Sequence, residues 1–414
     1  MAHGLPPKFW PLLYAALGCA VTWGAKPQPT KKACNYGFQA FGGNTGQEKA
    51  NLDWRAQKWN FIHTDRSFTE PDRIELLEPD GKTLSVYNNA YLTMVINTAC
   101  NAKCGFCIQE LKQRRPDGGV SNPSTSSSLS PRDYAQRVKT VLQFTKPVDP
   151  NISISGGEPT ISSRLPSVLE QIRQNPTPKL VIHTNGTRLL DPAPGEGFME
   201  KPPQNRWTVL DHLLEANLNH INMSVAHFDR ETNAAVMRMK PHDHDSLERA
   251  IEQAVKRGVR PRFSLVLLKE GIHDLKGLKD YLDWARNLGV DDIWIRELSA
   301  YDPTTTVFDH TAEYIDRERV KIDSILNEID QDPDFRLVLQ KSTTNSYRES
   351  YRFREVDIGF TDYRVIPPLV SLSGQPAPGN SSDKVKVFVL HPNGSLNAAW
   401  QEWERIIIPA PKPQ

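Results

Sequence analysis

The sequence predicts an α/β fold, a partial barrel of six strands that alternate with helices. Apolar runs rich in β-branched residues recur through the middle of the chain, and amphipathic stretches of helical length separate them. Chains with this alternation build βαβ units around a parallel sheet, and six units are enough for a partial barrel. The expected strands are Tyr91–Ile96, Ile152–Ser155, Leu180–His183, Ile221–Val225, Arg262–Leu268 and Ile293–Leu298. The expected helices are Ser130–Phe144, Ser162–Gln174, Val209–Ala216, Ser246–Arg257 and Leu275–Asn287.

The charge balance argues against a dedicated nucleic-acid binder. The chain has 414 residues, with 50 Lys and Arg against 49 Asp and Glu. A protein without net charge presents no overall field to a polyanion, so no nucleic-acid partner is expected. The apolar fraction and mixed charges are typical of a globular chain and not of a disordered one.

Four segments are expected. Residues 1–25 form a hydrophobic N-terminal segment, and residues 26–89 an extension with a β-hairpin, Arg73–Leu77 and Thr83–Tyr87, around the turn Pro79-Asp80-Gly81. Residues 90–300 form the α/β core. Residues 301–414 form a C-terminal extension with one helix, Arg317–Ile329, and a strand pair that begins at Val385–Leu390.

The hydrophobic N-terminal segment bears on the cellular compartment of the protein. Phe9–Ala25 is apolar behind a single lysine, Lys8, which is short for a membrane span and fits the hydrophobic part of a signal peptide. Export conflicts with the chemistry below, which needs a reducing compartment. We therefore expect a cytoplasmic protein, with membrane anchoring or export as the alternative.

Three of the five cysteines lie close together, in the pattern Cys100-x3-Cys104-x2-Cys107. Thiolates at this spacing each bind one iron of a 4Fe–4S cubane cluster and leave the fourth iron open to another ligand. Structural zinc prefers four nitrogen or sulfur ligands, and the nearest histidine that follows is His183. The spacing therefore favours an open cluster over a zinc knuckle.

The position of these cysteines supports a functional site. They follow the first expected strand directly, so they lie at the carboxyl end of the sheet, where active sites of such folds gather. Glycine or polar residues also end the next three strands. They are Gly156, Gly157, Glu158 and Pro159 after the second, Thr184, Asn185 and Gly186 after the third, and Ser224 in the fourth.

This combination resembles the radical S-adenosylmethionine (SAM) superfamily over roughly residues 90–300, and within it the branch similar to the molybdenum-cofactor enzymes. The resemblance implies a partial barrel, a 4Fe–4S cluster on Cys100, Cys104 and Cys107, and SAM bound to the open iron. It also implies cofactor contacts from these residues: Phe106 to the adenine, Gly156, Gly157, Glu158 and Pro159 to the methionyl amino group, Thr184 and Asn185 beside them, and Ser224 to the ribose or carboxylate. Arg238 is either a partner for the SAM carboxylate or a solvated helix charge.

The sequence departs from that branch in two ways. No cysteine follows Cys107, whereas the molybdenum-cofactor enzymes carry a second cysteine trio near the C-terminus. Ser153 stands where those enzymes have an arginine before the glycine pair. Neither departure supports GTP cyclisation, and the first also excludes an auxiliary cluster.

The expected activity is reductive cleavage of SAM to a 5′-deoxyadenosyl radical, which abstracts a hydrogen atom from a peptide or small-metabolite substrate. An electron donor such as flavodoxin or ferredoxin is implied. Substrate is expected at the barrel mouth near His183, His227, Ser264, Arg296 and Glu297. A non-catalytic iron–sulfur or zinc-binding scaffold is the alternative, and a methyl donor that uses SAM without radicals is a more distant one. Cys19 and Cys34 stand alone, and nothing in the sequence places them near the barrel.

Overall fold

The computed structural model describes residues 73–121, 128–192, 207–240, 243–298, 306–342, 347–362 and 385–412. The chain divides into two compact units, residues 1–73 and 74–414, and the described residues belong to the second unit except for Arg73. The N-terminal hydrophobic run, Cys19 and Cys34 lie outside the described residues. Among the residues described, no helix has the length and apolar character needed to cross a membrane.

A single large sheet organises the described part of the chain. Its order is β10-β11-β12-β9-β8-β7-β6-β5-β2-β13-β14-β15, and β1 pairs with β2. The stretch from β12 to β13 is parallel throughout. The six predicted strands are all present at its centre, as β2 (Thr83–Val95), β5 (Asn151–Ser155), β6 (Leu180–Thr184), β7 (His220–Ser224), β8 (Arg260–Val266) and β9 (Asp292–Arg296). The partial α/β barrel is confirmed, and it is open between the described edge strands.

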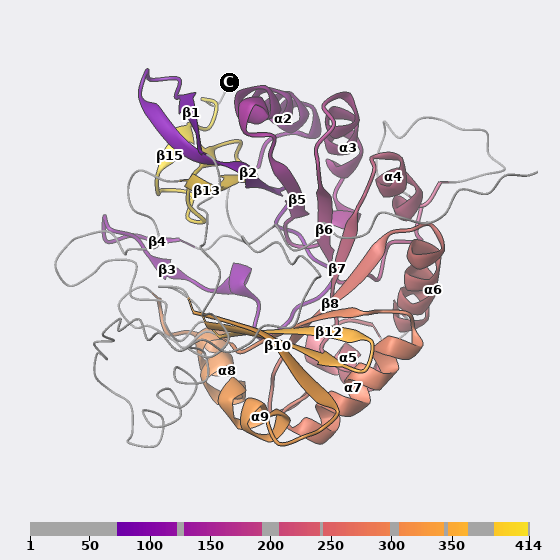
Figure 1. Cartoon of the computed structure of the whole chain (residues 1–414). Coiled ribbons are helices and arrows are strands. Elements are labelled where there is room, and N and C mark those ends of the chain that lie inside the picture. The colour runs from indigo at the N-terminus through magenta and orange to yellow at the C-terminus, as the bar shows by residue number, and fades with distance from the viewer. Residues whose placement is uncertain are drawn as a thin grey trace, which may run out of the picture. The chain divides into compact units, whose positions relative to one another are not determined.

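Helices cover the outer face of the curved sheet (Figure 1). They are α2 (Pro131–Thr145), α3 (Leu165–Gln174), α4 (Val209–Glu215), α6 (Asp243–Lys256), α7 (Leu275–Asn287) and α9 (Ile322–Ile329). Two more helices, α5 (Arg230–Met237) and α8 (His310–Glu318), pack at the carboxyl end of the sheet. The start of α2 is set as the sequence predicts: the Ser130 side chain accepts a hydrogen bond from the Asp133 amide, and Pro131 occupies the first turn.

The predicted hairpin is present but continues into the barrel. β1 (Arg73–Leu77) pairs with β2, and the turn closes through the Gly81 amide, which donates to the Glu78 carbonyl at 2.9 Å. β2 then runs on past Asn89, which has a positive φ of 57°, as the first strand of the parallel sheet. The expected segment boundary at residues 89 and 90 therefore falls inside one strand.

The C-terminal extension adds more to the sheet than predicted. β12 (Val356–Asp362) extends the parallel sheet beside β9, and β13 (Val385–Leu390) extends it beside β2. The predicted strand pair is present, since β13 pairs antiparallel with β14 (Leu396–Asn397). The remaining strands are β3 (Gln113–Arg114), β4 (Val120–Ser121), β10 (Phe335–Ser342), β11 (Tyr347–Phe353) and β15 (Ile406–Ile408).

The prediction of one helix over Arg317–Ile329 is wrong. The chain forms α8 and α9 there, with extended backbone between them at Arg319 (φ −58°, ψ 128°). Arg319 makes an antiparallel bridge to Leu268, and its Nε donates to the Leu298 carbonyl at 2.9 Å. These tertiary contacts outweigh the helical pattern of the sequence.

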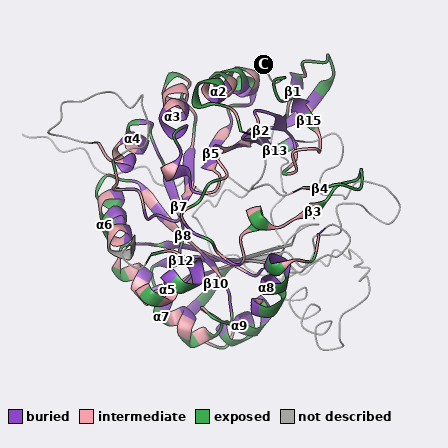
Figure 2. Cartoon of the chain, turned by 180° about the vertical axis from the view of Figure 1, so that it is seen from behind, coloured by how far each residue is buried: buried purple, intermediate pink, exposed green. Residues whose placement is uncertain are grey.

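Two apolar clusters hold the described residues together. The larger extends from Leu76 in β1 to Ile408 in β15 and fills the space between the sheet and its outer helices, where the strands are largely buried (Figure 2). The smaller lies at the carboxyl end of the sheet, and Cys104, Phe106, Leu111, Met239 and Val266 pack against it. Its buried members are Ala226, Val236, Met237, Leu268, Leu298, Tyr314 and Ile315.

Candidate functional site

The three cysteines lie on the loop that follows β2, at the carboxyl end of the parallel strands. Cys100 is exposed, and Cys104 and Cys107 are half-buried. The Cys104 sulfur lies 3.7 Å from the Met237 sulfur and 3.5 Å from the Met237 carbonyl, which fixes this thiol against the end of α5. The loop thus presents Cys100 to solvent and packs Cys104 against the smaller apolar cluster.

The glycine pair after β5 lies directly under the cysteine loop. The Gly157 amide donates to the Asn97 carbonyl at 3.0 Å, and the Glu158 amide donates to the Ala99 carbonyl at 2.8 Å. A Cβ atom on Gly157 would lie 2.2 Å from the Ala99 carbonyl oxygen. Position 157 therefore requires glycine because the backbone of the cysteine loop packs directly against it.

Glu158 is a buried carboxylate whose partners all lie within the site. It accepts from the Thr160 amide at 3.0 Å, the Thr160 hydroxyl at 2.5 Å, the Thr184 hydroxyl at 2.6 Å and the Asn185 amide at 2.7 Å. Burial raises the pKa of this carboxyl, and the hydrogen bonds oppose that rise. Its side chain thereby ties the end of β6 to the segment after β5.

Asn185 supports the cysteine loop from the other side. Its side-chain amide donates to the Asn101 oxygen at 2.8 Å, and its own oxygen accepts from the Thr187 hydroxyl at 2.8 Å. Gln109, which the sequence did not single out, donates to the Gly156 carbonyl at 2.5 Å. The polar residues at the strand ends, which the resemblance assigned to the cofactor, thus also hold the loop in place.

A small pocket opens beside the cysteine loop. It is lined by Phe106 from the loop, Ser224, Val225 and Ala226 at the end of β7, Met237 in α5, and Ser264 and Val266 in β8. Two residues that the resemblance assigned to SAM, Phe106 and Ser224, therefore share one pocket, together with the substrate candidate Ser264. The pocket combines apolar walls with the hydroxyls of Ser224 and Ser264.

Tyr314 closes this region from α8, in the segment predicted as a separate extension. Its ring packs on Gly105 so tightly that a Cβ atom there would lie 2.6 Å from it, and its centre is 6.5 Å from the ring of Phe106. Arg238, exposed and left-handed (φ 49°) at the end of α5, lies over the same ring at 5.5 Å. Nothing in the local sequence pattern singles out Tyr314, because its role comes from long-range packing.

The thiols fit an iron–sulfur cluster by chemistry and by position. Partial desolvation of the sulfur raises the pKa of Cys100 to about 11, although the residue as a whole is exposed. Burial raises the pKa of Cys104 to about 12, and the neighbouring thiols add to that shift. Positive iron is the natural counter-charge for thiolates crowded in this way. Among the residues described, no His, Cys, Asp and Glu side chains converge on a single metal ion. Convergence is not expected of a cubane cluster, because each thiolate binds a different iron.

The barrel interior below the pocket is polar. His183 in β6 and Asn222 in β7 are register neighbours, and the Asn222 amide nitrogen lies 3.4 Å from His183 Nδ1. Burial, followed by the charges of Arg296 and Arg262, lowers the pKa of His183 to about 4, so this imidazole is neutral at pH 7.

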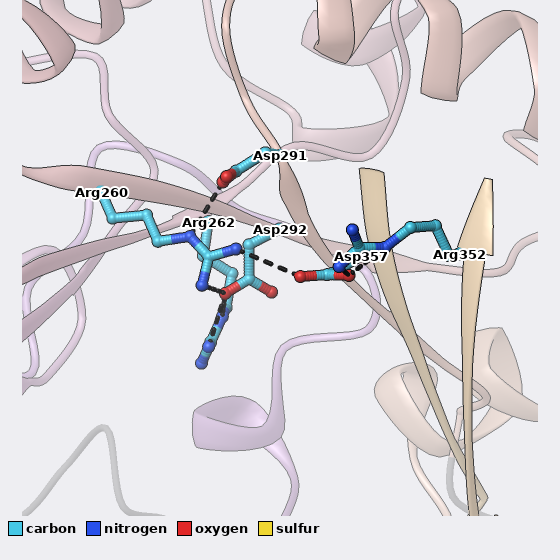
Figure 3. A network of polar contacts seen from close by, with 6 residues as sticks. All are labelled: Arg260, Arg262, Asp291, Asp292, Arg352 and Asp357. Carbon is cyan, nitrogen blue, oxygen red and sulfur yellow. Dashed lines mark hydrogen bonds and ion pairs between the residues drawn. The ribbon is translucent and has the colours of Figure 1, made fainter. Parts of the chain in front are cut away.

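Arginines and aspartates neutralise each other at the amino ends of β8, β9 and β12 (Figure 3). Arg262 donates twice to Asp292, at 2.9 and 2.7 Å, and Arg260 donates to Asp291 at 2.8 Å. Asp357 accepts from Arg352 Nε at 2.9 Å and lies 3.5 Å from Arg260. This network stabilises the base of the sheet.

Two further substrate candidates lie elsewhere. Glu297 is buried, accepts from the Ile322 amide at 2.8 Å and pairs with Arg319, so it joins β9 to α9 and does not reach the interior. The His227 ring stacks on Phe228 at 4.4 Å, and its Nδ1 accepts from the Asp229 amide at 2.9 Å. Neither shares the pocket beside the cysteine loop.

Comparison with known proteins agrees with this geometry. Residues 94–282, which include the cysteine loop and the strands that surround the pocket, match the profile of the Radical SAM superfamily. This part of the chain is similar to a radical SAM domain. Domains of this family use a 4Fe–4S cluster and SAM.

The radical SAM domain has curated relatives among archaeal enzymes. A probable GTP 3′,8-cyclase of Methanococcus aeolicus is 25% identical over 203 residues, 48% of this chain and 56% of the relative. A probable GTP 3′,8-cyclase of Thermoplasma volcanium is 25% identical over 240 residues, 58% of this chain and 61% of the relative. The chain therefore spans little more than half the length of these relatives. SuiB of Streptococcus suis bound to SAM superposes with a TM-score of 0.45 at 15% identity, over 76% of this chain and 61% of SuiB.

Proposed function

We propose that this radical SAM protein holds a 4Fe–4S cluster on Cys100, Cys104 and Cys107 and cleaves SAM reductively to act on a peptide or small metabolite. The observation that carries the proposal is the joint placement of the cysteine loop, the Gly157–Glu158 backbone and the pocket that contains Phe106 and Ser224. When bound, the cluster supplies the electron that breaks the C5′–S bond of SAM, and the resulting 5′-deoxyadenosyl radical takes a hydrogen atom from substrate.

The side chains of this domain position the reaction and exclude water. The segment Gly156–Pro159 contacts the methionyl end of SAM through groups other than the Gly157 and Glu158 amides and the Gly156 carbonyl, which bind the cysteine loop and Gln109. Phe106 covers the adenine, and Ser224 offers a hydroxyl to the ribose or carboxylate. Tyr314, backed by Arg238, covers the cysteine loop and keeps solvent from it. Glu158, Thr184 and Asn185 act as positioning residues, because their side chains bind the loop and one another.

A scaffold that keeps the fold without catalysis is the second candidate. A scaffold would have no need of a pocket beside the cysteines. The pocket lined by Phe106, Ser224 and Ser264 therefore argues against a scaffold. GTP is the first nucleotide to test as substrate, because two relatives bear the name GTP 3′,8-cyclase. The absence of any cysteine after Cys107 argues against that substrate.

The implied partners follow from the chemistry. A one-electron donor such as flavodoxin or ferredoxin must reach the cysteine loop, and the exposed Cys100 lies on its solvent side. A cluster that is reduced to low potential needs a reducing compartment, so we propose that this domain works in the cytoplasm.

Product analysis tests the proposal. The protein is reconstituted anaerobically with iron and sulfide, then incubated with dithionite and SAM. We expect 5′-deoxyadenosine, and its loss in Cys104→Ala. S-adenosylhomocysteine in its place would indicate methyl transfer without radicals, and a bound cluster with neither product would favour the scaffold.

A further inference from the structure

Arg296 in β9 has no counter-charge among the residues that the structure describes. Its Nε is buried and has no hydrogen-bond partner, and its side chain makes no ion pair with any described residue. The arginines below it are neutralised, Arg262 by Asp292 and Arg352 by Asp357 (Figure 3). An unpaired, half-buried guanidinium is costly, so its presence at this position calls for an anion supplied from elsewhere.

The register of the sheet places this cation beside the pocket. Arg296 is the register partner of Val266, which lines the pocket, and side chains at paired positions of parallel strands share a face. Its charge also reaches His183, three strands away, where it helps to lower the pKa of that imidazole. The guanidinium therefore points into the interior and not toward the outer helices.

A second polar atom in the same interior lacks a partner. The side-chain oxygen of Asn222 is buried without a hydrogen bond, although its amide nitrogen lies near His183. Buried polar atoms are nearly always satisfied in folded proteins, so this acceptor is a second polar group in the barrel interior that a bound molecule can satisfy. It lies four residues below the level of Arg296 in the strand register, so the proposal rests on Arg296 alone.

We propose that Arg296 binds an anionic group of the substrate, a carboxylate or a phosphate, inside the barrel beside the SAM pocket. The proposal rests on the proposed function, which requires substrate next to SAM. Arginine suits this role because its planar fork gives two parallel hydrogen bonds to either anion. The anion then sets the depth at which the rest of the substrate meets the pocket.

Probe anions test this on the reconstituted, SAM-loaded protein. Thermal unfolding is followed against inorganic phosphate or acetate, with chloride at equal ionic strength as the reference, in wild type, Arg296→Met, Arg296→Lys and the exposed control Arg132→Met. The affinity for SAM and the formation of 5′-deoxyadenosine are measured on the same samples. The difference between variants isolates the site from general salt effects.

We expect at least one anion to stabilise wild type and Arg132→Met equally. In Arg296→Met its half-saturating concentration should rise at least about tenfold, the loss expected for a charge-assisted hydrogen bond, whereas Arg296→Lys keeps part of the effect. SAM affinity should be unchanged in Arg296→Met, and its unfolding temperature without added anion should equal that of wild type or exceed it, because the variant removes a costly unpaired charge. Phosphate and acetate together distinguish the two anion types.

Four results would overturn the proposal. The first two are an equal response of wild type and Arg296→Met, and no response of wild type to either anion. The third is a loss of SAM affinity in Arg296→Met, which would assign the arginine to the cofactor carboxylate. The fourth is a large fall in the unfolding temperature of Arg296→Met, which would assign the arginine to stabilising the fold. Failure of wild type to cleave SAM contradicts the proposed function instead, and leaves the anion result to be judged by itself.

Discussion

The buried carboxylate of Glu158 organises the site at the level of single residues, because two amides and two hydroxyls donate to it. In Glu158→Gln one acceptor becomes an NH2 group that faces donors. We expect the free energy of unfolding to fall by about 2–3 kcal/mol, the cost of leaving buried donors unpaired. Chemical denaturation measures this, and Glu170→Gln, a partly exposed pair with Arg173, should lose less than about 1 kcal/mol. Equal losses would mean that Glu158 does not hold the site together.

His183 gives the molecule an acid-sensitive group. Its folded pKa is about 4, below the ordinary 6.5, so the unfolded state binds the proton first and stability is lost as the pH falls from about 6.5 toward 4. At pH 5 this histidine should cost roughly 2 kcal/mol relative to pH 7.5. In His183→Gln the difference between unfolding free energies at pH 7.5 and 5 should shrink by that amount. An unchanged difference would show that the imidazole titrates normally.

The sequence predicts which residues belong to the site more readily than it predicts the hydrogen-bond partners of those residues. The spacing of the cysteines and the glycine pair is local, so it is visible in the sequence. The hydrogen bonds of Thr184 and Asn185 to Glu158 and Asn101 join segments far apart in the chain, and no local pattern reveals them. Tyr314 was missed for the same reason.

At the scale of elements, the cysteine loop and the segment after β5 behave as one unit. The Cβ atom in Gly157→Ala would overlap the Ala99 carbonyl, so the two backbone hydrogen bonds between the segments must lengthen. We expect a loss of about 1–3 kcal/mol in unfolding free energy, typical of overpacking, and less iron retained after reconstitution. Gly271→Ala is the matched control, since its Cβ would meet ordinary contacts at 3.6 Å. Full iron retention in Gly157→Ala would contradict the coupling.

The predicted helices and strands are accurate where the apolar periodicity of the sequence matches the face that the structure buries. Each central strand of the sheet was predicted because its apolar run is local. The single helix over Arg317–Ile329 failed because the pairing of Arg319 with Glu297 and Leu268 is long-range. The parallel strand β12 was missed for a related reason, because Val356–Asp362 joins the parallel sheet through its long-range pairing with β9.

At the scale of the whole molecule, strands from the C-terminal extension complete the sheet. β13 lies beside β2, and the buried ring of Phe388 meets Phe144 of α2 edge-on at 6.3 Å. In Phe388→Ala we expect a loss of about 3–5 kcal/mol, the usual cost of a large buried cavity. Unfolding followed by circular dichroism and by cluster absorbance should shift together. Separate transitions for the two signals would show that the C-terminal strands fold apart from the cluster-binding core.

The central claim is that three cysteines leave one iron of the cluster open to SAM beside the pocket. Electron paramagnetic resonance of the dithionite-reduced protein, with and without SAM, tests it most directly. We predict the signal of one reduced 4Fe–4S cluster per chain, changed in shape by SAM and absent in Cys100→Ala, Cys104→Ala and Cys107→Ala. A cluster signal that SAM leaves unchanged, or one that survives loss of any of these cysteines, would contradict the account.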